Sequence, residues 1–163
     1  MAEQTITEIG LKNGIVRIAY EEIVGQDTHE VRVESPDEPR KAFMDALDAM
    51  AIHAARLMEI PVPEEYVVGL TVRSVKIKPK DDGSWGLVVS CIKKLSGGQV
   101  LSLNTAYTED VPDSDSAGAL PVKCIDAVNA LVIEAEAYLD GKRAQGDLFE
   151  REEKPDGKSA AAG

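Results

Sequence analysis

Few side chains in this sequence could carry out nucleophilic or acid–base chemistry. His29 and His53 are the only histidines, and neither lies beside an exposed-nucleophile motif such as Gly-x-Ser-x-Gly. Glu21 and Glu22 are neighbours in an expected strand, where consecutive side chains point to opposite faces, so their carboxylates cannot act as a catalytic pair. We therefore expect no catalytic residues and no enzymatic activity.

The two cysteines do not form a recognisable metal or redox motif. Cys91 falls in an expected strand and Cys124 in an expected helix, and the sequence has no Cys-x-x-Cys. Because neither cysteine is clustered with a histidine in the sequence, we expect two buried thiols, with a disulfide or a metal pair as the alternative. We predict no metal and no cofactor.

Lysines gather where two strands are expected to form a hairpin. Three share one parity of the first strand, two sit on the returning strand, and a tryptophan lies near them. The set is Lys76, Lys78, Lys80, Lys93 and Lys94, with Trp85. Such a strip could bind the phosphates of single-stranded nucleic acid. The alternative is a solvated face whose lysines prevent edge-to-edge pairing of strands.

A short stretch near the C-terminus places an aliphatic and an aromatic residue among charged ones. Leu148 and Phe149 follow Gln145 and Asp147, with basic residues before them and acidic residues after them. A segment this charged is a poor candidate for a core, so we expect a partner's groove to bury the pair. The stretch follows a helix stop at Gly141, which would let it extend into such a groove. The alternative is that it folds back on its own domain.

This stretch resembles the peptide by which bacterial DNA polymerases, mismatch-repair proteins and other replication factors bind the bacterial sliding clamp. The pattern is Gln, a variable residue, Asp or Ser, Leu or Met, and Phe, and it is matched by Gln145, Asp147, Leu148 and Phe149. The resemblance implies that the last two side chains fill an apolar pocket on the clamp and that the glutamine hydrogen-bonds in a second subsite. Gly146 stands where Leu or Ala is commoner.

The resemblance implies a non-enzymatic accessory protein of DNA replication, recombination or repair, encoded by a phage and acting in the bacterial or phage-infected cytoplasm. Two alternatives stay open. One is a protein that binds or anneals single strands through the lysine strip. The other is an acidic inhibitor of a host nucleic-acid enzyme, which a net charge of −11 would suit. A homo-oligomer, formed through a half-covered sheet or Ile52, is also open.

Length and composition fit one domain with a tail. The chain has 163 residues and one compositional break, so we assign residues 1–141 to an α+β domain and residues 142–163 to a flexible polar tail. With 44% apolar and 29% charged residues, the chain has the balance of a globular protein. We find no signal-peptide pattern and no long apolar run, and therefore expect a soluble cytosolic protein without membrane contact.

Hydrophobic periodicity predicts the element order ββαβββα. Strands are expected over Ile15–Val24, Thr28–Glu34, Tyr66–Lys80, Trp85–Leu95 and Val100–Tyr107, after a polar arm of residues 1–14. One helix is expected between Ser35 and Pro61 and another from Pro121 to about Asp140. The apolar parity inverts near Arg73 and Ser74, which predicts a β-bulge. The expected fold is a mostly antiparallel five-stranded sheet with two helices on one face.

Overall fold

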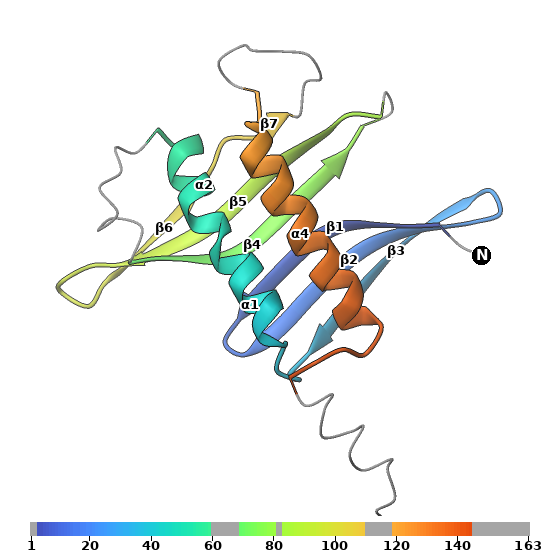
Figure 1. Ribbon diagram of the computed structural model, residues 1–163, viewed down its shortest axis with the longest axis horizontal. Coiled ribbons are helices and arrows are strands. Elements are labelled where there is room, and N and C mark those ends of the chain that lie inside the picture. The colour runs from blue at the N-terminus through green and yellow to red at the C-terminus, as the bar shows by residue number, and fades with distance from the viewer. Residues whose placement is uncertain (1–2, 60–68, 81–82, 110–118, 145–163) are drawn as a thin grey trace, which may run out of the picture.

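An antiparallel sheet forms one layer of the fold and helices form the other (Figure 1). The computed structural model describes residues 3–59, 69–80, 83–109 and 119–144. The strands are β1 (Glu3–Lys12), β2 (Ile15–Val24), β3 (Asp27–Ser35), β4 (Leu70–Pro79), β5 (Trp85–Lys94), β6 (Val100–Asn104) and β7 (Thr108–Glu109). The helices are α1 (Lys41–Asp48), α2 (Met50–Leu57) and α4 (Val122–Leu139). The α+β class and the antiparallel sheet are confirmed.

The strand order is β3-β2-β1-β4-β5-β6, with β7 pairing with β5 beyond the end of β6. Two three-stranded meanders therefore meet at β1 and β4, which pair antiparallel through Glu8 with Lys76 and Gly10 with Ser74. The prediction of five strands is wrong. The segment expected to be a polar arm contains β1, and β7 is a second strand that the sequence did not predict. β1 lies in the interior of the sheet.

A β-bulge explains why β1 escapes detection from the sequence. Its pairing with β2 shifts between Ile6 and Glu8, so the apolar residues after the shift change parity relative to those before it. Ile6 and Ile9 are both buried although three positions separate them. Without the bulge, this spacing does not match the alternation of a strand.

The bulge predicted in β4 is confirmed. The pairing of β4 with β5 shifts between Val72 and Ser74, and Arg73 is the extra residue. The shift brings two apolar pairs of opposite parity to the same face, where all four side chains are buried. These are Leu70, Val72, Val75 and Ile77. The bulge also leaves Arg73 and Ser74 side by side on the other face, where both border one groove.

The first predicted helix is interrupted at Ala49, so α1 and α2 follow one another with their buried residues directed at the sheet. Phe43 and Leu47 of α1 and Met50 of α2 have relative exposures of 2% or less. The predicted second helix is confirmed as α4, which packs beside α1 and α2 across the same face (Figure 1).

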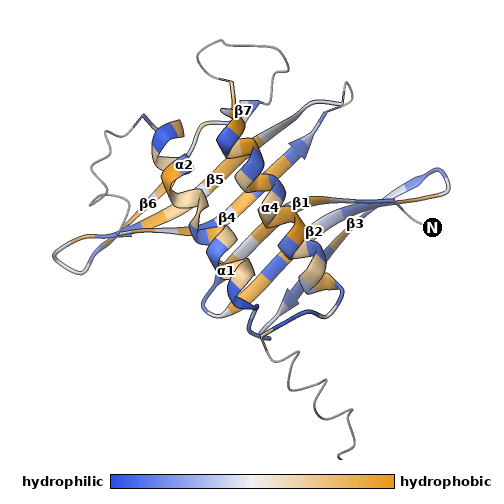
Figure 2. Cartoon of the chain, in the orientation of Figure 1, coloured by the Kyte–Doolittle hydropathy of each residue, from blue (hydrophilic) through white to orange (hydrophobic). Residues whose placement is uncertain are grey.

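The core lies between this helix layer and the sheet. Figure 2 shows apolar and polar residues alternating along the strands beneath the helices. The opposite face of the sheet is not covered by any described helix. Within the described residues, no helix combines the length and the apolar character needed to cross a membrane.

Candidate functional site

The predicted clamp-binding residues Gln145, Asp147, Leu148 and Phe149 lie outside the described residues. The described chain ends at Ala144, so the structure defines the point that directly precedes them. This point lies beside the segment that precedes α1 (Figure 1).

The chain is held at this point by hydrogen bonds and an ion pair. Ala144 donates its backbone N–H to the carbonyl oxygen of Glu38 at 2.8 Å. The Tyr138 hydroxyl donates to the carbonyl oxygen of Asp37 at 2.7 Å, and Arg143 Nη1 lies 2.5 Å from an Asp37 carboxylate oxygen. The Arg143 guanidinium also lies over the Tyr138 ring, 4.2 Å from its centre. Gln145 therefore follows a residue that is fixed to the body of the domain.

The structure separates the predicted lysine strip into two groups. Lys76 and Lys78 alternate with the buried Val75 and Ile77, so they project from the uncovered face. Lys80 forms an ion pair with Glu109. Lys76 and Lys78 belong to the end of β4 that approaches the hairpin with β5, and Lys80 directly follows β4.

The other predicted strip residues lie elsewhere. Lys93 is opposite Leu70, at the far end of β5 from Trp85, which is opposite Pro79. Trp85 and Lys93 share the parity of the buried Leu87 and therefore belong to the helix-covered face, whereas Lys94 returns to the uncovered face. Trp85 packs against the core. Contrary to the prediction from the sequence, the register between β4 and β5 therefore does not group Trp85, Lys93 and Lys94 with Lys76 and Lys78.

Charge is segregated between the two halves of the sheet. The strands β1, β2 and β3 contain seven carboxylates and three cations, a net charge of −4. The strands β4, β5 and β6 contain five cations and no carboxylate. The sequence between Leu70 and Asn104 has acidic residues only at Asp81 and Asp82, which lie outside the described residues. A chain with a net charge of −11 thus has one locally basic half-sheet.

A groove of about 730 Å³, lined by polar and apolar residues, crosses the uncovered face where the two halves meet. Small residues in register across neighbouring strands contribute to its lining: Gly10, Ser74, Ser90 and Asn104. Arg73 also lines it, and its buried Nε has no hydrogen-bond partner in the described part of the chain. The groove therefore offers hydroxyl, amide and guanidinium donors.

Tyr107 covers Gly86 near the basic end of β4. A Cβ atom on Gly86 would lie within 2.2 Å of the Tyr107 ring, so only glycine allows the ring to pack there. Gly86 is opposite Lys78, and its missing side chain would point to the uncovered face. Tyr107 is 41% exposed. An exposed aromatic ring thus lies near the two lysines.

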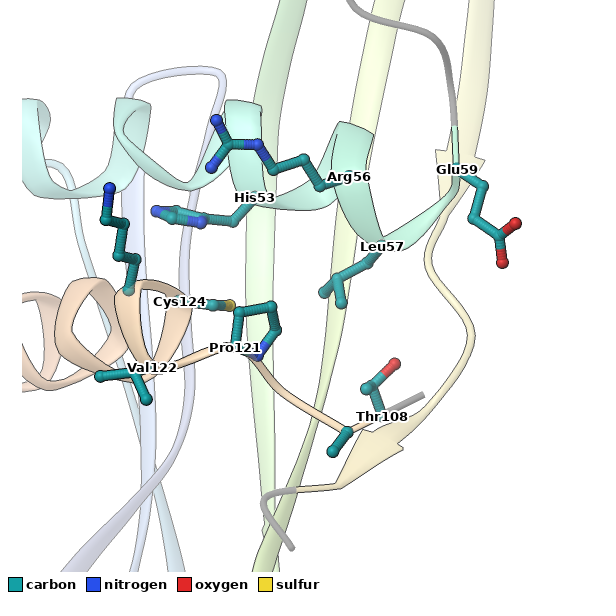
Figure 3. A pocket seen from close by; sticks show the side chains of 10 residues that line it. His53, Arg56, Leu57, Glu59, Thr108, Pro121, Val122 and Cys124 are labelled. Carbon is teal, nitrogen blue, oxygen red and sulfur yellow. The ribbon is translucent and has the colours of Figure 1, made fainter. Parts of the chain in front are cut away.

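A pocket of about 400 Å³ lies on the helix side of the molecule. Figure 3 shows His53 and Arg56 extending from α2 on one side and Pro121 and Cys124 at the start of α4 on the other. Burial lowers the pKa of His53, and the positive charge of Arg56 lowers it further. Burial also raises the pKa of the Cys124 thiol to about 11. At pH 7 the thiol is therefore protonated and poorly nucleophilic.

Cys91 and Cys124 are both buried free thiols, as the sequence predicted. Among the described residues, His, Cys, Asp and Glu side chains form no group of three or more that could hold a metal ion. No family model, no curated protein and no solved structure matches this chain. The chemistry of its surfaces must therefore be inferred from its own residues.

Tyr138 and Arg143 hold the end of α4 to Asp37, and we call this set of contacts the anchor. Sequence reasoning missed these two residues and also the surface residues Arg73 and Tyr107. The absence of carboxylates along the last three expected strands is a signal that could have indicated the basic half-sheet. Counting the register outward from the β4–β5 hairpin could have placed Lys93 and Lys94 far from Trp85. The anchor depends on contacts between residues about one hundred positions apart, such as Tyr138 and Asp37, for which the sequence carries no local signal.

Proposed function

We propose that this protein is a non-enzymatic accessory factor of bacterial DNA replication, recombination or repair, encoded by a phage, that docks on the sliding clamp through residues 145–149. The observation that carries the proposal is the match of Gln145, Asp147, Leu148 and Phe149 to the clamp-binding pattern. In this proposal Leu148 and Phe149 enter an apolar pocket on the clamp, and Gln145 hydrogen-bonds beside it.

The position of the peptide supports the proposal. Gln145 directly follows Ala144, whose backbone is hydrogen-bonded to Glu38 at 2.8 Å. The anchor fixes the start of the docking segment, which limits the volume that the bound domain can sample. Tethering of this kind raises the local concentration of the domain near its target without requiring tight binding by the peptide itself.

The site of action in this proposal is the cytoplasm of a bacterial cell, where the clamp encircles DNA. A bound domain could bring a second activity to the clamp or exclude other proteins that use the same pocket. A competition experiment separates these outcomes. A peptide covering residues 142–151 should displace a fluorescent clamp-binding peptide from the purified clamp, whereas the same peptide with Leu148→Ala and Phe149→Ala should not. Equal displacement by both peptides would refute docking through the pattern.

A further inference from the structure

We propose that the uncovered face of β4, β5 and β6 binds single-stranded nucleic acid, with Lys76, Lys78 and Arg73 contacting the backbone and Tyr107 stacking on a base. This inference goes beyond clamp docking, because it assigns an activity to the folded domain.

The position of Lys76 in β4 argues against a purely protective role for this lysine. Lysines on an edge strand prevent unwanted pairing with other strands. β4 pairs with β5 along its length and with β1 at Ser74–Lys76, whereas Lys78 lies beyond the residues paired with β1. Lys76 therefore does not guard an edge, and its exposure on the sheet face needs another explanation.

Local charge favours a phosphate-bearing ligand. No carboxylate occurs in β4, β5 or β6, although the chain as a whole has 29 acidic and 18 basic residues. On the uncovered face, Glu8 is opposite Lys76 and forms an ion pair with Arg32 at 3.7 Å. Glu109 is in register with Lys78 through Gly86 and forms an ion pair with Lys80. Glu8, Glu21 and Glu30 line one groove together with Lys76 and Lys78, so a phosphate would have to compete with these carboxylates for the lysines. Lys76, Lys78 and Arg73 are the three cations of β4, and β4 itself has no carboxylate.

Arg73 adds a guanidinium to the lining of the groove. The bulge places it next to Ser74 on the uncovered face, and its buried Nε lacks a hydrogen-bond partner in the described chain. The side chain as a whole is half-buried, and its guanidinium is the candidate donor to a phosphate in the groove. The hydroxyl groups of Ser74 and Ser90 and the amide of Asn104 line the same groove and could contact phosphate or sugar.

Tyr107 favours a single strand over a duplex. Its ring lies over Gly86, opposite Lys78, and is 41% exposed. Stacking on such a ring requires an unpaired base, and each stacked base adds to affinity with little dependence on sequence. The combination of a basic strand with a neighbouring aromatic ring is the one that sequence-tolerant single-strand binders use.

The test is fluorescence anisotropy with a labelled oligothymidylate and the full chain, at low salt and without the clamp. The variant Lys76→Gln/Lys78→Gln should bind at least tenfold more weakly than the wild type. The control Lys41→Gln/Lys123→Gln removes the same charge from the helix side, changes the net charge equally from −11 to −13, and should change affinity less than twofold. Tyr107→Leu should weaken binding about fivefold or more.

Salt dependence gives a second readout. Three backbone contacts predict a slope of log affinity against log salt of about −2, falling to about −0.7 in the double lysine variant. Equal affinity of the two double variants would overturn the proposal, as would the absence of binding or preferential displacement by an unlabelled duplex. Equal melting midpoints of the wild type and the variants show that the variants are folded. If Lys76→Gln/Lys78→Gln is unstable, Lys78→Gln alone replaces it in the binding measurement. Leu148→Ala/Phe149→Ala should bind the oligonucleotide normally, which separates this site from clamp docking.

Discussion

Arg143 packs its guanidinium over the ring of Tyr138, with the guanidinium carbon 4.2 Å from the ring centre. The two residues also share a target, because the Tyr138 hydroxyl donates to the Asp37 carbonyl oxygen and Arg143 pairs with the Asp37 carboxylate. The end of α4 is thereby fixed to the segment before α1. This contact fixes the chain just before Gln145, the first residue of the proposed docking peptide.

Removing one hydroxyl from this anchor should destabilise the protein. Tyr138→Phe loses a 2.7 Å hydrogen bond to the Asp37 carbonyl oxygen, which should lower the free energy of unfolding by about 1 kcal/mol. Urea denaturation measures the change. Tyr107→Phe is the matched control, because the Tyr107 ring is 41% exposed, and it should change stability by less than about 0.5 kcal/mol. Equal effects of the two substitutions would contradict the assigned role of Tyr138.

Gly10 allows β1 and β4 to approach closely where the two halves of the sheet meet. A Cβ atom there would lie 2.9 Å from the Arg73 carbonyl oxygen and 3.2 Å from Ser74 Cβ. We expect Gly10→Ala to destabilise the protein by about 1–3 kcal/mol in urea denaturation. Gly97→Ala is the control, because its Cβ would first meet the side chain of Gln99, which can move. A stability loss confined to Gly97→Ala would show that the close approach is unimportant.

The two ends of the chain should differ sharply in their tolerance of truncation. Deleting residues 1–12 removes β1 from between β2 and β4, so the product should show no cooperative unfolding transition. Deleting residues 145–163 keeps the anchor at Ala144 and should leave the melting midpoint within a few degrees of the wild type. Thermal denaturation followed by circular dichroism measures both. A cooperative transition in the first product would mean that β1 is dispensable.

The bulges decide how much of the fold can be predicted from sequence. The strand Ile15–Val24 and the helix Val122–Leu139 were predicted because their periodicity is unbroken. The bulge in β4 was also predicted, since long apolar alternation continues on both sides of it. In β1, the alternation on each side of the bulge after Ile6 is too short to be recognised, and the strand was missed.

The candidate site was predictable only in part, for a related reason. Lys76 and Lys78 were correctly placed on one parity of a strand, which depends on local sequence alone. Whether Lys93 and Trp85 join them depends on the register between two strands, and that register places Lys93 opposite Leu70. Tyr107 could not be placed from the sequence. The strand predicted over Val100–Tyr107 ends at Asn104 in the structure, and Tyr107 lies between β6 and β7.

The buried thiols should make stability fall at alkaline pH. Burial raises the pKa of both Cys91 and Cys124 from 9.0 to about 11. Above pH 9 the unfolded state loses these protons while the folded state keeps them, so stability decreases as the pH rises toward 11. Urea denaturation at pH 8 and pH 10 should show a smaller decrease for Cys91→Ala/Cys124→Ala than for the wild type. An identical decrease in both proteins would contradict the assignment of this effect to the thiols.

Calorimetric titration of the full chain into the purified bacterial sliding clamp tests the central claim most directly. We predict saturable binding by the wild type, with one peptide bound per clamp pocket, and loss of measurable heat with Leu148→Ala/Phe149→Ala. A protein with Lys154→Ala/Lys158→Ala, altered just beyond the pattern, should bind as the wild type does. Undiminished binding by the Leu148→Ala/Phe149→Ala protein, or no binding by the wild type, would contradict the proposal that residues 145–149 dock on the clamp.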